Sequence, residues 1–208
     1  MPYGFLDIAG TPSVKAAQAA NGAAALWERS DFDRAFDRFT AAEAQFIARR
    51  DSFYLATASE TGWPYVQHRG GPPGFLRLLD DRTLAFADYR GNRQYISLGN
   101  LAADGRAALI LMDYPSQARL KIYAHVEIRD LASDPALAER LAVPGYRGKA
   151  ERAFVLRLAA FDWNCQQHIT PRFTQAELEP ALAPIRQRLA ELEADNATLR
   201  ARLAIEER

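Results

Sequence analysis

Short β-type runs follow one another between residues 52 and 161, and this feature most constrains the fold. Each run combines aromatic or β-branched residues with turn signals at its ends, such as Thr61-Gly62. Successive strands with few helices between them are typical of a small antiparallel barrel. We expect strands over residues 53–57, 63–67, 75–79, 83–87, 107–112, 120–129 and 153–161.

Helical patterns flank these strands. Residues 31–50 carry apolar side chains at helix-like spacing, and Thr40 with Glu43 forms a capping-box pattern. We therefore expect two short helices that separate near Thr40. A third is expected after Arg93, and a fourth opens at Asp134-Pro135. The predicted fold class is mainly β (α+β).

A chain of 208 residues fits one domain with extensions. Residues 1–29 form an N-terminal extension, whose Ala- and Gly-rich part we expect at the surface or around a partner. Residues 30–173 form the barrel domain. Residues 174–208 form a C-terminal helix.

Apolar residues recur along this C-terminal helix in alternating steps of four and three, which is the a/d seam of a coiled coil. We expect its continuous part to start at Pro184, and Asn196 at an a position favours two parallel strands. A single amphipathic helix packed on its own domain is the alternative. The seam is Leu178, Leu182, Ile185, Leu189, Leu192, Asn196, Leu199 and Leu203, and the g-to-e′ pairs are Arg188 with Glu193, Asp195 with Arg200, and Arg202 with Glu207.

Composition and motifs argue against several functions. The 26 basic and 26 acidic side chains cancel, which disfavours nucleic acid and anionic membranes as partners. The single cysteine and the lack of a signal-peptide or membrane-span pattern in residues 1–25 favour a cytoplasmic location. The three histidines lack zinc-ligand spacing, and hydrolase, P-loop and Rossmann motifs find no match.

Three polar segments are candidate binding sites. In residues 67–74, glycines let the backbone approach a ligand beside Arg69. Residues 88–95 form a strand-to-helix turn, where free amides, the helix dipole, Asn92 and Arg93 favour a phosphate. In residues 162–172, Trp163 offers a flat face to an aromatic ring, beside several amide groups. Ordinary turns, solvated arginines and core packing of Trp163 are the alternatives.

Taken in order, these segments resemble the pyridoxamine 5′-phosphate oxidase-like family of FMN-binding split barrels. The resemblance covers residues 40–172. It rests on the strand over 53–57, the turn with Gly62 and Pro64, the strand over 65–69, the strand and turn over 86–94, the helix with Asn100, the strand over 119–127, Trp163 and Arg172.

The resemblance implies FMN as the cofactor and a homodimer with shared flavin sites, to which the second subunit contributes Trp163 and Arg172. Arg93 stands at the position of the family's phosphate-binding arginine. Lys121 and His168 are candidate substrate contacts. The cofactor-binding residues that it implies are Gln67, His68, Arg69, Gly70, Asp88, Tyr89, Gly91, Asn92, Arg93, Trp163, Asn164, Gln167 and Arg172.

The sequence also departs from the family's oxidase. Residues 168–172 do not reproduce its Arg-x-His pair, residues 70–74 interrupt a strand that ends in its substrate lysine, and the C-terminal helix is foreign to it. We therefore expect an FMN-dependent oxidoreductase that acts on another small molecule or electron donor. The alternatives are a non-catalytic flavin sensor or carrier, or the same barrel with a deazaflavin coenzyme or haem.

Overall fold

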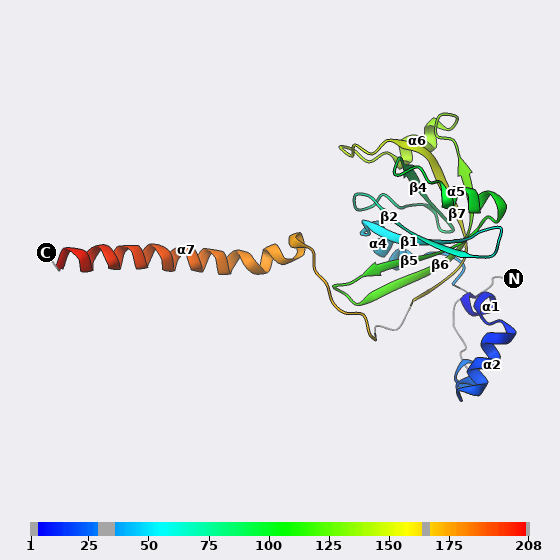
Figure 1. Cartoon of the computed structure of the whole chain (residues 1–208), viewed down its shortest axis with the longest axis horizontal. Helices are drawn as coiled ribbons and strands as arrows, with labels where there is room; N and C mark the ends of the chain where they lie inside the picture. Colours follow the sequence, from blue (N-terminus) through cyan, green and yellow to red (C-terminus); the bar gives the residue numbers. More distant parts are fainter. Residues whose placement is uncertain (1–3, 29–35, 164–166, 207–208) are drawn as a thin grey trace. The chain divides into compact units, whose positions relative to one another are not determined.

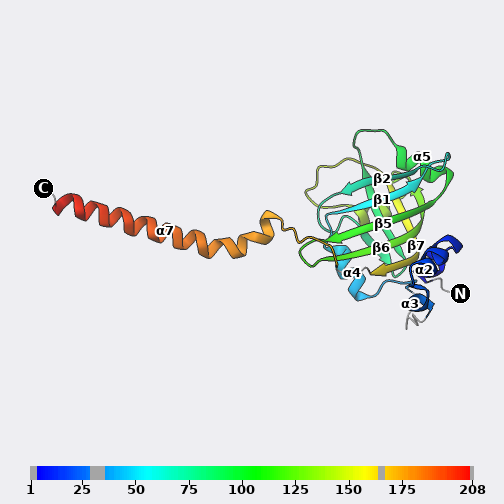
Figure 2. The same cartoon turned by 60° about the horizontal axis from the view of Figure 1, so that its bottom comes forward.

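The computed structural model describes residues 4–28, 36–163 and 167–206. Seven strands form one antiparallel sheet in the order β2-β1-β5-β6-β7-β4-β3 (Figure 1). The strands are β1 (Ser52–Ala58), β2 (Pro64–Gly70), β3 (Arg77–Asp80), β4 (Thr83–Tyr89), β5 (Arg106–Asp113), β6 (Ala118–Arg129) and β7 (Ala150–Trp163). Figure 2 shows β2, β1, β5 and β6 side by side.

The sheet curls around a phenylalanine-rich core without closing into a complete barrel. β1 and β4 are separated in the sheet by three strands, yet the rings of Phe53 and Phe86 meet at 5.2 Å between centroids. Phe86 in turn stacks on Phe154 of β7 at 5.0 Å. The ladder leaves β2 and β3 as its two edges, so the fold is an α+β split barrel.

The strand predictions are confirmed, with shifted ends. The third strand begins at Arg77 rather than at residue 75, because the Phe75 amide donates to the Pro72 carbonyl (3.0 Å) in a turn where Gly74 has φ +80°. The seventh begins three residues earlier than expected, at Ala150, because pairing with β4 extends it.

Two predicted helix caps are confirmed around the barrel. In α4 (Ala41–Ala48), the Glu43 carboxylate accepts the Thr40 amide at 2.8 Å. In α6 (Pro135–Leu141), Asp134 accepts the Leu137 amide at 3.0 Å. The helix expected after Arg93 is α5 (Ile96–Ala103). The helix expected between residue 31 and Thr40 falls partly on residues 31–35, which lie outside the described residues; residues 36–39 are described and are not helical.

Three short helices precede the barrel: α1 (Phe5–Ala9), α2 (Pro12–Ala20) and α3 (Ala24–Glu28). The side chains of α2 are almost all exposed, as expected for this Ala-rich segment. The Phe5 ring of α1 stacks on Tyr123 of β6 at 4.6 Å.

A second compact unit comprises residues 114–116 and 169–208 and contains α7 (Gln175–Glu206). The expected start at Pro184 is wrong, because the helix begins at Gln175 and runs through Pro180 and Pro184. A capping box at Thr174 explains the earlier start, since its amide donates to the Glu177 carboxylate at 2.8 Å. Within the described ranges, no helix is long and apolar enough to cross a membrane.

Candidate functional site

A polar cavity of about 220 Å³ lies where β2, β4, β7 and the start of α5 meet. Arginine, carboxylate and amide side chains dominate its wall. The lining residues are Gln67, Arg69, Asp88, Tyr89, Gly91, Asn92, Arg93, Tyr95, Leu98 and Glu151.

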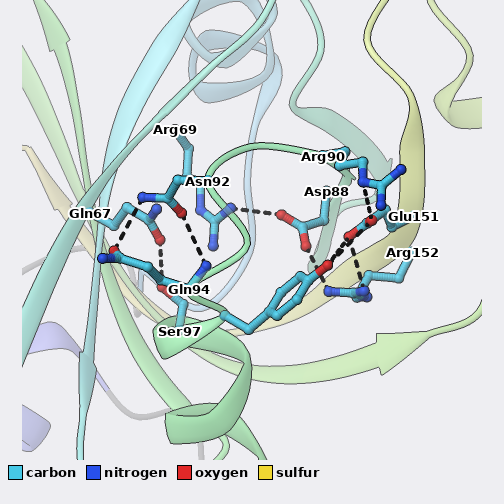
Figure 3. A network of polar contacts seen from close by, with 10 residues as sticks. Gln67, Arg69, Asp88, Arg90, Asn92, Gln94, Ser97, Glu151 and Arg152 are labelled. Atoms are coloured by element: carbon cyan, nitrogen blue, oxygen red, sulfur yellow. Dashed lines mark hydrogen bonds and ion pairs between the residues drawn. The ribbon is translucent and has the colours of Figure 1, made fainter.

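Asp88 of β4 stands at the centre of the charged groups of this cavity (Figure 3). Its Oδ1 accepts a hydrogen bond from Arg69 Nη1 at 2.7 Å, and its Oδ2 accepts one from Arg152 Nη1 at 3.2 Å. Arg69 comes from the edge strand β2 and Arg152 from β7. The carboxylate thus joins three strands, two of which lie far apart in the sheet order.

Glu151 is the second carboxylate of the cavity. It accepts a hydrogen bond from Arg152 Nη2 at 3.1 Å and one from the Tyr95 hydroxyl at 3.0 Å. Arg90 Nε lies 3.4 Å from it. Four arginines, those at 69, 90, 93 and 152, therefore face two carboxylates, and the group carries an excess of positive charge.

The turn that carries Arg93 has an unusual backbone. Arg93 and Tyr95 have φ of +64° and +52°, a region that costs non-glycine residues free energy and is often found at functional sites. Asn92 Oδ1 accepts the Gln94 amide at 3.2 Å and supports the turn. Among the residues that the structure describes, Arg93 makes no ion pair, so its guanidinium is available to an anion.

Two hydrogen bonds attach α5 to the barrel beside the cavity. Ser97 Oγ donates to Gln67 Oε1 at 2.9 Å, and buried Asn100 donates to Thr57 Oγ1 at 3.0 Å. The start of α5, and with it the Arg93 turn, is therefore held against β1 and β2.

Burial shifts the pKa of two side chains of the cavity. Asp88 is only 7% exposed, and loss of solvation raises its pKa above the usual value of 3.8, although Arg69 and Arg152 oppose the shift. Burial likewise raises the pKa of the Tyr89 hydroxyl. Titratable groups perturbed in a cleft are typical of functional sites.

The cavity brings together seven of the thirteen residues predicted to bind the cofactor. All seven come from the first two polar segments, on β2 and on β4 with the turn that follows it. They are Gln67, Arg69, Asp88, Tyr89, Gly91, Asn92 and Arg93.

His68 and Gly70 also lie on β2 but do not line the cavity. Successive side chains of a strand point to opposite faces, and Gln67 and Arg69 take the cavity side. His68 contacts Tyr54 of β1 instead, with ring centroids 5.6 Å apart.

Trp163 and Lys121 make contacts away from the cavity. The Trp163 indole donates to Glu43 Oε1 at 2.7 Å, and its ring meets Phe46 at 4.8 Å, which matches the core-packing alternative. Lys121 Nζ lies 2.7 Å from Asp162 and 4.7 Å from the Phe5 ring centroid.

The other predicted residues that the structure describes do not line the cavity either. Gln167 and His168 are exposed and do not line the cavity, and Arg172 lies over the Tyr114 ring at 5.1 Å within that unit. Asn164 lies outside the described residues.

Sequence reasoning missed Glu151, Arg152 and Tyr95. The first two precede the predicted start of the seventh strand, and only the pairing of Asp88 with Arg152 across β4 and β7 reveals their place. The available signal in the sequence was the pair of charged residues, Glu151 and Arg152, directly before the predicted strand. The left-handed conformation of Tyr95 has no signal in the sequence.

Two larger cavities offer less to an anion. One, of about 350 Å³, is lined mainly by small side chains of β1, β5 and β6, and its Arg106 is bound to Asp104 through both carboxylate oxygens. The other, of about 430 Å³, lies beside α6, and no charged side chain of the described residues lines it.

The fold and the cavity together define a split-barrel protein with an arginine-rich polar site. Comparison with known protein families shows to which family the chain belongs. The sequence profile described as pyridoxamine 5′-phosphate oxidase matches residues 39–163, more than half of the chain. The chain therefore belongs to the pyridoxamine 5′-phosphate oxidase family. The search of curated proteins found no significant sequence match to this chain.

Several solved structures are similar to this one. A putative pyridoxamine 5′-phosphate oxidase from Lactobacillus delbrueckii is 20% identical, over 61% of this chain and 94% of that one, with a TM-score of 0.46. An FMN-binding protein from Syntrophomonas wolfei is 15% identical, over 74% and 95%, with a TM-score of 0.43. An F420 reductase is 23% identical, over 57% and 94%, with a TM-score of 0.41.

Proposed function

We propose that this protein binds FMN and is an oxidoreductase that acts on a small molecule. The observation that carries the proposal is the guanidinium of Arg93, which makes no ion pair within the described residues and is held in a strained turn directly before α5, beside Arg69 and Asn92. A phosphate monoester suits this donor set, because paired guanidinium donors match phosphate oxygens. Family membership supports the same cofactor.

The residues present fit FMN. Arg93, Arg69 and Asn92 would hold the phosphate, while Gln67 would meet the ribityl chain or polar atoms of the ring. Arg69 Nε is buried and has no hydrogen-bond partner within the described part of the chain, so a donor is left over for a ligand. Bound FMN would supply the capacity to accept and donate electrons, and the protein would position it.

The size of the cavity supports a shared site. Its 220 Å³ is below the roughly 300–1,000 Å³ of pockets that enclose a drug-sized ligand. The cavity therefore suits the phosphate and ribityl part of FMN, and the ring system needs a second surface. We propose that a second copy of the chain provides it, with exposed Arg172 and the accessible part of half-buried Trp163 as its predicted contacts.

An exposed apolar face of the barrel supports this dimer. Val66 of β2, Tyr54 of β1 and Ile110 of β5 are 60%, 42% and 39% exposed. Tyr54 pairs directly with Ile110, and Val66 pairs with Ala56 beside them, so the three side chains share the outer face of adjacent strands. A contiguous apolar patch is typical of a protein interface.

We further propose that α7 pairs in parallel with α7 of the second copy. Its seam residues Ile185, Leu189, Leu192, Leu199 and Leu203 are 48% to 64% exposed. In the heptad of this seam, Pro180 and Pro184 fall at f and c, on the outer side, so they leave the seam intact. Pairing would raise the effective concentration of one barrel near the other.

Cysteine cross-linking tests whether the two α7 helices of the proposed dimer run parallel. In a Cys165→Ser background, Leu199→Cys at a d position is expected to form a disulfide-linked dimer on oxidation, and Ala201→Cys at an f position is not. An antiparallel pair would keep the two Leu199→Cys thiols apart. Equal cross-linking of the two variants would contradict the proposed seam.

The absorption spectrum of the purified protein tests the cofactor. Bound flavin is expected to give bands at roughly 370 and 450 nm, whereas a Soret band would indicate haem. A deazaflavin coenzyme would be distinguished by mass spectrometry of the released cofactor. A colourless protein that takes up no FMN on reconstitution would contradict the proposal.

Reduction of the bound flavin tests turnover. The exposed α7 favours one alternative, a flavin sensor or carrier that signals to a partner. Anaerobic mixing of the FMN-bound protein with reduced nicotinamide is expected to bleach the flavin if the protein is an oxidoreductase. No bleaching with any common donor would favour the sensor or carrier.

A further inference from the structure

Asp88 poses a problem for an anion site, because it places a carboxylate in the wall of the cavity. A negative charge there repels a phosphate, and the surrounding medium is less polar than water, which strengthens the repulsion. The sequence-based prediction made Asp88 a direct contact of the cofactor. In the structure, each of its oxygens already accepts a hydrogen bond from an arginine.

Asp88 is the carboxylate partner of Arg69 among the described residues, and it shares Arg152 with Glu151. Arg69 lies over the rings of Phe154 and Phe86, with its guanidinium carbon 5.3 and 5.9 Å from the ring centroids. Its Nη1 bond to Asp88 is the polar contact that orients it. Arg152 lies over the Tyr95 ring at 5.0 Å and shares its donors between Asp88 and Glu151.

The three groups come from three different strands. β2 supplies Arg69, β4 supplies Asp88 and β7 supplies Arg152. β2 is an edge strand that has β1 as its only sheet neighbour in the ladder, so the Asp88 contact ties it to the opposite side of the curled sheet. The orientation of the Arg69 side chain towards the cavity thus depends on a contact outside the hydrogen-bonded strand ladder.

We propose that Asp88 is a positioning residue, which holds Arg69 and Arg152 in the orientation that receives the phosphate-bearing cofactor. The inference rests on the proposed function, namely that the cavity binds FMN. Asp88 neutralises part of the charge of the two arginines that it orients, and Arg93, which makes no ion pair among the described residues, keeps its full charge for the phosphate. Burial of Asp88 opposes its ionisation, so the site keeps a charge that is unfavourable for stability.

Asp88→Asn distinguishes positioning from simple repulsion by the sign of its effect. The substitution keeps the shape and removes the charge. If Asp88 only repelled the phosphate, FMN would bind more tightly to the variant. If Asp88 positions the arginines, FMN should bind at least tenfold more weakly, although the cavity has become more positive.

Asp113→Asn is the matched control. It removes the charge of another buried carboxylate that binds an arginine, Arg50 Nη2 at 2.8 Å, and Asp113 does not line the cavity. FMN affinity of Asp113→Asn is expected to be unchanged. A loss equal to that of Asp88→Asn would overturn the specific role of Asp88.

FMN and riboflavin titrations of the full chain, followed by flavin fluorescence, give the readout. The ratio of the two affinities is expected to fall in Asp88→Asn, and a general weakening of the fold would not change it selectively. Arg152→Lys, which keeps the charge but loses the forked donors, is expected to lower the same ratio and serves if Asp88→Asn does not fold. An unchanged ratio in a folded variant would overturn the positioning role.

Wild-type titrations separate this inference from the proposed function. Failure of the wild-type protein to bind FMN would overturn both. Tight FMN binding by the wild type together with equal or tighter binding by Asp88→Asn would overturn the positioning role alone.

Discussion

Replacement of Arg93 by Ala tests the phosphate site directly. Arg93 is exposed and makes no ion pair in the described part of the chain, so its loss should leave the fold intact. Ala keeps a Cβ at the same φ of +64°, so the backbone strain of the turn is unchanged. Any change in FMN affinity therefore reports the lost guanidinium.

The expected size follows from the chemistry of the contact. A hydrogen bond to a charged group contributes about 1.5–3 kcal/mol. With tenfold in affinity for each 1.4 kcal/mol, the loss corresponds to about 10- to 150-fold weaker FMN binding. Because solvent reaches Arg93, screening places the expectation near the lower end, about tenfold.

Fluorescence titration with FMN and riboflavin measures the effect. Riboflavin lacks the phosphate, so its affinity should not change in Arg93→Ala. Arg90→Ala is the control within the same turn, because Glu151 at 3.4 Å partly neutralises Arg90 and its effect should stay below about threefold. Wild-type FMN affinity in Arg93→Ala would refute the assignment of the phosphate site.

Three further predictions concern stability and assembly. Phe86→Ala, at a side chain 1% exposed in the aromatic core, should lower the free energy of unfolding by about 3–5 kcal/mol in a urea titration. A loss below about 1 kcal/mol would show that the neighbouring core side chains move to fill the space left by the Phe86 ring. Because the folded pKa of Asp88 is raised, its contribution to stability is full below the unfolded value of 3.8 and is lost as pH rises through the folded value. The stability of the wild type relative to Asp88→Asn should therefore fall with rising pH above 3.8, and a constant difference between the two would contradict the shift. Asn196→Leu should leave FMN affinity unchanged but allow α7 to form mixed oligomers in light-scattering measurements, whereas a single dimeric species would argue against a buried a-position amide.

Local features of the sequence determined most of the secondary structure. Alternating and β-rich runs predict all seven strands because strand residues share a two-residue period. The capping patterns at Thr40 and Asp134 mark α4 and α6. The Glu43 carboxylate accepts a hydrogen bond from the Thr40 amide, and the Asp134 carboxylate accepts one from the Leu137 amide. Prolines were a poorer guide: α7 continues through Pro180 and Pro184, since the capping box at Thr174 starts the helix earlier.

The sequence predicts those parts of the site that are formed by residues close together in the chain. The turn at Asn92 and Arg93 has a strand before it and a helix after it, so the sequence alone indicates a phosphate cradle. The face of β2 was not predictable from its sequence, because the two-residue period leaves open whether His68 or Arg69 points inward. Packing against the aromatic core places Arg69 inside.

Only the tertiary structure decided the partners of Asp88. Residues 69, 88 and 152 are distant in the chain, and they meet because β4 pairs with β7 while the sheet curls β2 towards β4. Neither the order of strands nor the curl is encoded in any one segment, since both arise from the burial of aromatic residues contributed by several strands. The sequence by itself therefore determined the strands and the anion-binding turn, and the tertiary structure decided which charges surround it.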